Sequence, residues 1–282
     1  MSIQIKNLCK NYGKKEVLKN ISLTFEENKI YGLLGRNGVG KSTLLKVISN
    51  RLLKTSGEIS IDGISKTDSN EAQQKIYMVG EDSFVPLGMK VKNALKLTGQ
   101  FYDNFDMDYA CRLAEQFGLP LKSRISSLST GYRTIYKIVT ALSVNTPYII
   151  LDEPTLGLDS YHRDLFYKLV IEKYSESPCT IILSTHLIGE VSTVIENAVI
   201  LHNGEVLKDE AMDLLLSCGY TVSGKMSDVD AFCKDKKVIG NIETIGGLKS
   251  VCIEGTPNKS EIPDNLEISR LDLQQLFIKL TN

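Results

Sequence analysis

This 282-residue sequence lacks long apolar runs and a large net charge. No stretch approaches the roughly 20 apolar residues that cross a bilayer, although the hydrophobic fraction of 42% can supply a full core. The formal net charge of −1 leaves neither a global basic field for nucleic acid nor an acidic tail. We therefore expect no membrane span and no nucleic-acid partner.

Other common signals are also missing. The six cysteines lie far apart, with no C-x-x-C pair and no neighbouring histidine, which argues against a metal or redox site. Internal repeats, coiled-coil heptads and low-complexity tracts are not found. The first residues, Met1–Lys6, lack the apolar core of a signal peptide, so we expect a cytoplasmic protein.

Residues 35–43 carry the most informative pattern. They read G-R-N-G-V-G-K-S-T, which matches the phosphate loop G-x-x-x-x-G-K-[ST]. The apolar runs Ile30–Leu34 and Leu44–Ile48 supply the strand–loop–helix context of that loop. Its glycines let backbone N–H groups turn towards a polyphosphate, and the helix points its positive end at the same anion. The pattern predicts that Lys41 reaches the β- and γ-phosphates and that Ser42 ligates Mg²⁺.

Hydrophobic patterning predicts an α/β fold. Ile3–Leu8 alternates apolar and polar residues, and with Ile21–Phe25 and Gly57–Ile61 it indicates an antiparallel β layer. Short, nearly all-apolar runs are typical of parallel strands covered by helices on both faces, and they occur at Ile76–Val79, Tyr148–Leu151, Thr180–Leu183 and Ala198–Leu201. Residues from about 91 to 142 are predicted to be largely helical.

The pattern changes near residue 210. Beyond it, short strand-like pieces follow one another among helices expected at 211–218, 225–237 and 271–280. We therefore predict an ATP-binding domain over residues 1–210, with a helical subdomain at about 82–145. Residues 211–282 are predicted to form a small α+β domain, which we call the appendage.

A second chemical motif follows a predicted core strand. Tyr148–Leu151 is entirely apolar and ends in Asp152 and Glu153, which places two carboxylates at the carboxyl edge of the sheet. Ligands of open parallel α/β sheets bind at that edge. Asp152 is suited to hold Mg²⁺ through water, and Glu153 is suited to polarise an attacking water. Alone, this pair could be a plain strand-end turn, but the phosphate loop in the same chain favours a nucleotide site.

Together these motifs resemble the ATP-binding subunits of ABC transporters. Leu128–Tyr132 is similar to the signature sequence Leu-Ser-Gly-Gly-Gln, and Thr155–Asp159 resembles the D-loop. Ser184–His186 resembles the switch histidine that follows the next strand. Tyr12, with Val17 five residues on, resembles the aromatic residue that stacks on adenine, although a lone tyrosine could equally pack at a strand edge. The motifs occur in family order across residues 1–210.

The resemblance implies a P-loop NTPase fold of the ABC cassette type, with ATP and Mg²⁺ as cofactors. It makes Lys41, Glu153 and His186 the catalytic residues of an ATPase, in which His186 contacts the γ-phosphate and helps position the water. The implied metal ligands are Ser42, Asp152 and Glu81. The implied nucleotide-binding residues are Tyr12, Val17, Gly35, Arg36, Asn37, Gly38, Val39, Gly40, Lys41, Ser42, Thr43, Ser129, Gly131 and Asp159.

In this family the ATP site is divided between two chains. Ser129 and the backbone of Gly131 would therefore bind the γ-phosphate held by a second copy or by a paralogous subunit. The resemblance thus predicts a dimer that ATP holds together and that hydrolysis releases.

This sequence departs from the family at two places. Glu81 stands where the family usually has a glutamine that senses Mg²⁺ and the membrane partner. The rate of ATP hydrolysis, or its coupling to the membrane partner, is therefore in question. Glu81 and Asp82 could also be a solvated loop. Thr130 and Tyr132 replace a glycine and the glutamine of the signature. The serine and the later glycine remain, so we expect the signature to function.

Two further sequence segments resemble a particular group of these subunits. Arg133–Val139 and the ending Leu273–Thr281 are similar to bacterial subunits that serve exporters of antimicrobial or amphipathic peptides, including phenol-soluble modulins. The resemblance predicts an exporter ATPase bound to a separate permease on the inner face of the cell membrane. An importer ATPase and a soluble regulatory ABC ATPase remain alternatives. The appendage could also be a structural cap or a piece that stabilises the dimer.

Overall fold

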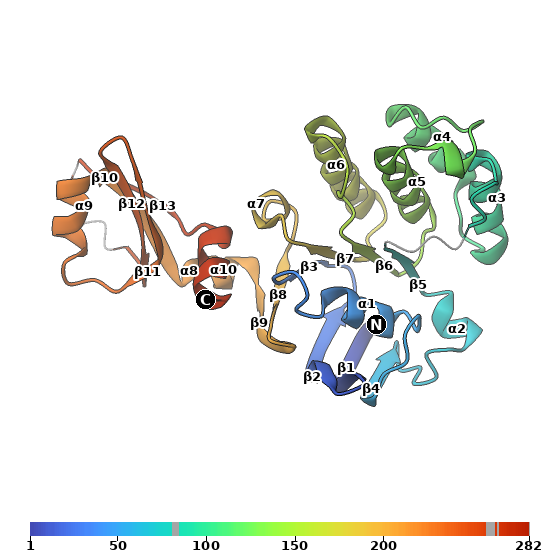
Figure 1. Ribbon diagram of the computed structural model, residues 1–282, viewed down its shortest axis with the longest axis horizontal. Coiled ribbons are helices and arrows are strands. Elements are labelled where there is room, and N and C mark those ends of the chain that lie inside the picture. Colours follow the sequence, from blue (N-terminus) through green and yellow to red (C-terminus); the bar gives the residue numbers. More distant parts are fainter. Residues whose placement is uncertain (81–84, 258–262, 264, 282) are drawn as a thin grey trace.

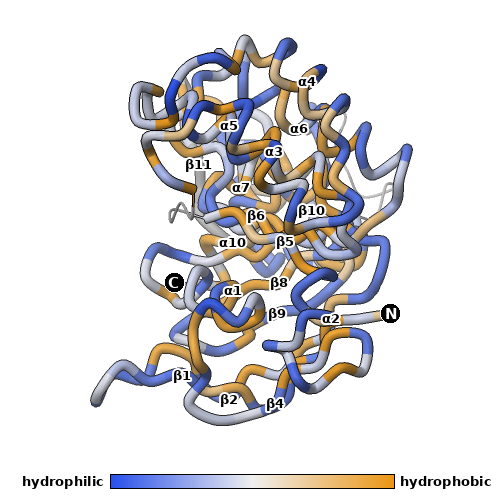
Figure 2. The backbone as a smooth tube through the Cα atoms, turned by 90° about the vertical axis from the view of Figure 1, so that its right-hand side faces the viewer, coloured by the Kyte–Doolittle hydropathy of each residue, from blue (hydrophilic) through white to orange (hydrophobic). Residues whose placement is uncertain are grey.

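The computed structural model describes residues 1–80, 85–257, 263 and 265–281. Three β-sheets organise the chain (Figure 1). Figure 2 places the smallest sheet at one end of the molecule and the helices within residues 91–143 at the other. Within the described residues, no helix is both long enough and apolar enough to cross a bilayer.

The first sheet is the predicted antiparallel layer. Its strands are β1 (Ser2–Tyr12), β2 (Lys15–Glu26) and β4 (Ser56–Ile61), in the order β2-β1-β4. Every second residue is buried where the strands pair, as Ile3 and Ile5 of β1 show. β1 and β2 are longer than the predicted segments. Their additional residues form an exposed hairpin, and its polar tip has no hydrophobic pattern from which strands could be predicted.

The six-stranded core sheet holds the site. Its order is β5-β6-β7-β3-β8-β9, and all pairs are parallel except the antiparallel pair β8–β9. The strands are β5 (Ile76–Val79), β6 (Tyr148–Asp152), β7 (Thr180–Thr185), β3 (Ile30–Leu34), β8 (Asn197–His202) and β9 (Glu205–Ala211). The predicted mainly parallel sheet is confirmed. The sequence did not predict β9, because the residues of this strand are mostly polar and none is buried.

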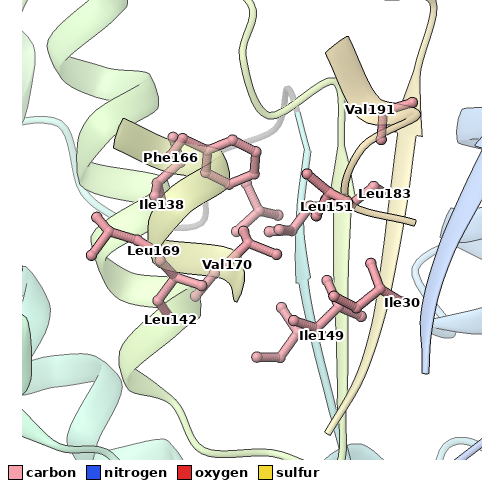
Figure 3. Packing of buried hydrophobic residues seen from close by; sticks show 14 of the residues in the cluster. Ile30, Ile138, Leu142, Ile149, Leu151, Phe166, Leu169, Val170, Leu183 and Val191 are labelled. Atoms are coloured by element: carbon pink, nitrogen blue, oxygen red, sulfur yellow. The ribbon is translucent and has the colours of Figure 1, made fainter. Parts of the chain in front are cut away.

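Helices cover both faces of the core sheet. α1 (Lys41–Ile48) shares a hydrophobic cluster with the β layer on one face. On the other face, α5 (Thr130–Ser143) and α6 (Ser160–Glu176) pack their apolar side chains against β6 and β7 (Figure 3). The sequence did not indicate α6, since its exposed Tyr161 and Ile171 dilute the apolar stripe formed by buried Phe166, Leu169 and Val170.

Further helices surround α5 and the sheet edges. α3 (Val91–Phe101) and α4 (Met107–Gln116) pack with α5, as the helical prediction for this region requires. Two single-turn helices, α2 (Asn70–Gln73) and α7 (Ile188–Val191), follow β4 and β7, and a 3₁₀ turn covers Ile125–Ser127. The proposed limits of the helical subdomain stay a prediction.

The C-terminal part forms a third sheet, antiparallel in the order β11-β12-β10-β13. Its elements are α8 (Met212–Ser217), β10 (Gly219–Lys225), α9 (Met226–Cys233), β11 (Val238–Ile245), β12 (Leu248–Glu254), β13 (Glu267–Arg270) and α10 (Leu273–Thr281). The helix expected at 225–237 is shorter than predicted, and β11 was not predicted. The boundary at residue 210 remains a proposal.

Candidate functional site

A cavity of about 370 Å³ opens beside the ends of β3, β6 and β7. Side chains from four of the motifs found in the sequence meet there. The lining residues are Val17, Asn37, Gly38, Gly40, Lys41, Ser42, Thr43, Glu153, Leu156 and His186. The cavity has the size of an ordinary small-molecule site.

The phosphate loop depends on glycine backbone geometry. Gly40 has a φ of 115°, and a Cβ atom there would lie 2.8 Å from Leu18 Cδ2. Gly38 also has a positive φ, 78°, which L side chains rarely adopt. Leu44 N donates to Gly40 O at 2.8 Å and begins the hydrogen bonding of α1. The helix therefore points its amino-terminal N–H groups at the loop, where an anion is favoured.

Lys41 places a buried cation in this loop. Its side chain is only 6% exposed, and Nζ donates to Gly35 O at 2.7 Å. Nζ also lies 3.9 Å from Glu153 Oε1. Burial lowers the pKa of Lys41, while the nearby carboxylates of Glu153 and Asp152 oppose that shift. A polyphosphate in the cavity would restore a full counter-charge to this ammonium group.

Asp152 and Ser184 carry unpaired polar atoms at the same sheet edge. The two residues are partners in the β6–β7 ladder. Within the part of the chain that the structure describes, Asp152 Oδ1 and Ser184 Oγ are buried without a hydrogen-bond partner. Such atoms cost about 1–3 kcal/mol each when left unpaired, so they favour a bound polar ligand.

The chemistry of these residues suits Mg²⁺, and the magnesium site stays a prediction. Among the described residues, no three His, Cys, Asp or Glu side chains gather into a metal cage. Mg²⁺ does not need such a cage, because it usually binds one or two protein ligands together with phosphates and water. Ser42 lines the cavity and Asp152 offers an unpaired oxygen, whereas the third predicted ligand, Glu81, lies outside the described residues.

Glu153 and His186 form a close pair at the cavity wall. His186 Nδ1 lies 2.8 Å from Glu153 Oε2. Glu153 is held by its backbone, since its N–H donates to Ser184 O at 2.9 Å and its carbonyl accepts from Leu156 N at 3.2 Å. Its φ of 49° is uncommon for a glutamate, and such strain is concentrated at functional sites. The fold thus fixes the direction in which this carboxylate leaves the sheet.

The signature residues lie outside the cavity lining. Ser129 is the N-cap of α5, and its Oγ accepts from Tyr132 N at 3.2 Å. A Cβ atom at Gly131 would lie 2.9 Å from Gly157 O, so the D-loop packs directly on the signature backbone. Among the described residues that line this cavity, Ser129 and Gly131 are not found, and the division of the site between two chains stays a prediction.

Four other predicted residues, Tyr12, Asp159, Arg36 and Val39, do not line this cavity. Tyr12 is 49% exposed, and Lys10 Nζ lies 5.1 Å from its ring centre; of the predicted adenine-binding pair, only Val17 is among the lining residues given above. Asp159 caps α6 by accepting from His162 N at 2.9 Å, and this hydrogen bond lowers the pKa of its carboxyl. Arg36 and Val39 line a neighbouring cavity of about 490 Å³. The roles of these residues stay predictions.

Two residues of the site were not singled out from the sequence. Leu156 lines the cavity, and its carbonyl accepts from Thr134 Oγ1 at 2.9 Å, which joins the D-loop to the signature helix. Ser184 faces Asp152 across the ladder. Both stand inside motifs that the sequence revealed, but their contacts depend on the folded arrangement of β6, β7 and α5.

Comparison with known proteins identifies relatives of this chain. The family described as "ABC transporter" matches residues 18–156. The chain is 32% identical over 190 residues to the ABC transporter ATP-binding protein YtrB of Bacillus subtilis, covering 67% of this chain and 65% of YtrB. It is 30% identical to the linearmycin resistance ATP-binding protein LnrL of B. subtilis, covering 73% of this chain and 68% of LnrL. The tungstate uptake system ATP-binding protein TupC of Peptoclostridium acidaminophilum is 30% identical, with 73% of this chain and 97% of TupC covered.

Solved structures give the same result. An ATP-binding subunit of an ABC transporter superimposes with a TM-score of 0.69 and 27% identity, over 76% of this chain and 92% of that one. The dimeric bacterial ABC transporter cassette MJ0796 has a TM-score of 0.67 and 27% identity, over 74% and 98% of the two chains. The predicted cassette fold is therefore confirmed.

Proposed function

The chain belongs to the ATP-binding subunits of ABC transporters and carries their ATPase domain, and on this premise we propose that it hydrolyses ATP to drive export of an amphipathic or antimicrobial peptide, or of a drug, through a separate membrane chain. One observation carries the hydrolytic part. A buried ammonium group, a carboxylate and an imidazole, those of Lys41, Glu153 and His186, line a single cavity, and the unpaired carboxylate oxygen of Asp152 lies at the same sheet edge. The transported substrate is proposed from resemblance alone.

In the proposed reaction, a water oxygen attacks the γ-phosphorus of ATP and the bond to the ADP oxygen breaks. Glu153 accepts a proton of that water, as its position at the cavity wall allows. His186, 2.8 Å from Glu153, orients the carboxylate and reaches the γ-phosphate. Lys41 stabilises the charge on the phosphates. Ser42 and Asp152 would hold Mg²⁺, which neutralises phosphate charge when bound.

We further propose that the site is completed by a second subunit. Ser129 and Gly131 lie away from the cavity of their own chain, where a partner's nucleotide could reach them. The dimer reported for MJ0796 supports this arrangement for a cassette of the same fold. The partner is a second copy or a paralogous ATPase subunit, and the permease holds the pair at the inner face of the membrane.

The relatives support two directions of transport. LnrL is named for resistance to linearmycin, which agrees with export, whereas TupC is named for tungstate uptake. The resemblance of Arg133–Val139 and Leu273–Thr281 to peptide exporters favours export. The importer ATPase is therefore the second candidate.

Phosphate release by the purified full chain tests the hydrolytic part of the proposal. Glu153→Gln should keep ATP affinity in calorimetry, because the phosphate loop is intact, while the rate falls by roughly 10²- to 10⁴-fold with loss of the base. The matched control is Glu172→Gln, an exposed carboxylate of α6 that pairs with Lys168. It should behave like the parent. A Glu153→Gln rate equal to that of the parent would refute the assignment.

Co-expression with the membrane protein of its own locus tests the transport part. The chain should sediment with membranes, and inverted vesicles should accumulate an amphipathic peptide only with ATP. Accumulation in right-side-out vesicles instead would favour the importer. A chain that stays in the supernatant whatever membrane protein is present would favour the soluble regulatory ATPase.

A further inference from the structure

The segment that follows the switch histidine is intrinsically weak. α7 begins two residues after His186, spans only Ile188–Val191 and contains Gly189. No side-chain hydrogen bond caps its amino terminus. Helices this short are not stable alone, and glycine weakens them further. The position of α7, and with it the backbone next to His186, must therefore be set by tertiary contacts.

The first of these contacts comes from α6. Arg163 Nη1 lies 2.7 Å from Glu190 Oε1, so an ion pair joins α7 to the helix that starts at the D-loop. Both side chains are about one-third exposed, and such pairs contribute little to stability. The ion pair aligns α7 but cannot by itself hold it against the core.

The second contact comes from the C-terminal helix. Leu273, Leu276 and Phe277 of α10 are buried at helical spacing and form one face. They share a hydrophobic cluster with Ile188 and Val191 of α7. α10 contacts α7, as its place in Figure 1 between the C-terminal sheet and α7 shows.

The rim of this contact is also tight. A Cβ atom at Gly189 would lie 3.3 Å from Gln274 Oε1, so α10 approaches α7 where α7 lacks a side chain. Burial of the apolar face is the larger effect, because Leu273, Leu276 and Phe277 remove almost all of their apolar surface from water. α10 is thus the main apolar support of α7 from the C-terminal side.

The rest of the appendage is organised around this helix. Ile239 of β11 and Cys252 of β12 belong to the same cluster as α10, on one face of the C-terminal sheet. The opposite face has a cluster of its own, which includes Val222, Val229 and Leu266 and is covered by α9. α10 therefore lies on the face of the C-terminal sheet that is turned towards the ATPase core, whereas α9 covers the opposite face of that sheet.

We propose that α10 is a positioning element for His186. It packs against α7 and holds residues 186–191 in the position in which His186 meets Glu153. A shift of the appendage then changes the rate of ATP hydrolysis without changing nucleotide affinity. This gives the appendage a regulatory role that a structural cap would lack. The inference rests on the proposed ATPase role of His186.

Two identical truncations in the full chain test it. Leu276→Ala removes support from α7, whereas Leu266→Ala makes the same change in the cluster on the far face. We expect Leu276→Ala to lower kcat roughly 10- to 100-fold, since a displacement of about 1 Å can cost that much. KM for ATP should stay within about two-fold, because the phosphate loop is untouched. Leu276→Met, which conserves volume, should restore kcat.

Hydrogen exchange gives a readout that does not need activity. Leu276→Ala should speed exchange of amides 186–191 and leave those of α1 unchanged, while Leu266→Ala should change neither. Equal loss of kcat in both alanine variants, or unchanged exchange at 186–191, would overturn the proposal. A parent without ATPase activity would refute the proposed function, and the exchange result would still decide whether α10 holds α7.

A second pair of variants applies if Leu276→Ala does not fold. Gly189 and Gln274 are both exposed, so changes there should spare the core. Gly189→Leu places a side chain between α7 and α10 and should lower kcat, and the added Gln274→Ala, which removes the neighbouring side chain without weakening the helix, should recover it. Failure of the second change to recover kcat would also contradict the proposal.

Discussion

At the scale of single residues, the charges of the site depend on each other. Glu153 stands between the Lys41 ammonium group at 3.9 Å and the His186 imidazole at 2.8 Å. Its backbone conformation, with φ at 49°, aims the carboxylate into the cavity. The proposed role of Glu153 as the base does not follow from its residue type alone. It depends on the turn after β6, which places this side chain between a cation and a histidine.

Asp62 illustrates a carboxylate with a structural role. It accepts from Tyr148 OH at 2.5 Å, from Ser2 N at 3.0 Å and from Lys75 Nζ at 2.8 Å, and so joins the β layer to the core sheet. Burial alone would raise the pKa of this carboxyl, but the hydrogen bonds from Lys75 and Tyr148 hold it below its ordinary value of 3.8. The charged form is therefore the stabilising one.

This network makes a prediction about stability and pH. Asp62→Asn should lower the free energy of unfolding at pH 7 by about 1.5–3 kcal/mol, the usual contribution of hydrogen bonds to a charged group. Asparagine tolerates the φ of 52° at this position, so the loss reports on charge. Because the folded pKa is lowered, this stabilisation is complete above the unfolded pKa and is lost as pH falls through the folded pKa, so the difference from the parent should shrink as pH falls below about 4.

Urea unfolding at pH 7 and at pH 3.5 measures this difference. Asp68→Asn, an exposed carboxylate in the same connection, is the control and should have little effect at either pH. A deficit of Asp62→Asn that is the same at both pH values would mean that the Asp62 charge has no part in stability.

At the scale of elements, the contact between α5 and the D-loop links the signature to the cavity. Thr134 Oγ1 donates to Leu156 O at 2.9 Å, and Gly131 packs on Gly157 O. Leu156 lines the cavity, so movement of the signature helix reaches the nucleotide site of its own chain. This connection is one route by which the two halves of a divided site could affect each other.

Gly131→Ala tests the contact. The added Cβ would lie 2.9 Å from the Gly157 carbonyl, and backbone cannot yield as a flexible side chain does. We expect each isolated chain to bind ATP as the parent does, while ATP-dependent dimerisation is lost, because the signature and D-loop no longer fit together. Calorimetry and light scattering measure the two properties.

Gly88→Ala is the matched control, since a Cβ at Gly88 has no neighbouring atom within 4 Å among the described residues. It should dimerise normally. Normal dimerisation of Gly131→Ala would show that the D-loop can move aside, and the role given to this contact would be wrong.

Sequence reasoning succeeded where local chemistry decides the structure. The apolar runs at Ile76–Val79 and Thr180–Leu183 are strands because only the interior of a sheet suits them, and the phosphate loop is recognised by its glycines. It failed where context decides. β9 is polar and pairs only because β8 lies beside it, and the apolar residues of α6 extend round its surface. The contact of α10 with α7 joins segments about 85 residues apart, which no local pattern reveals.

At the scale of the whole molecule, the ATP cavity and the signature belong to different parts of the surface. Ser129 and Gly131 are absent from the lining of the cavity of their own chain, as far as the described residues show. A single copy brings the phosphate loop, Glu153 and His186 to one place, while the signature lies elsewhere. The proposed division of the site requires ATP to lie between two subunits.

The mass of Glu153→Gln in solution, measured by light scattering with and without Mg·ATP, tests this claim most directly. Blocked hydrolysis should leave ATP in place and trap the pair. The account predicts the monomer mass of 31.3 kDa without nucleotide and twice that mass with Mg·ATP. A mass of 31.3 kDa in both conditions, with ATP bound by calorimetry, would contradict a site shared between two copies of this chain.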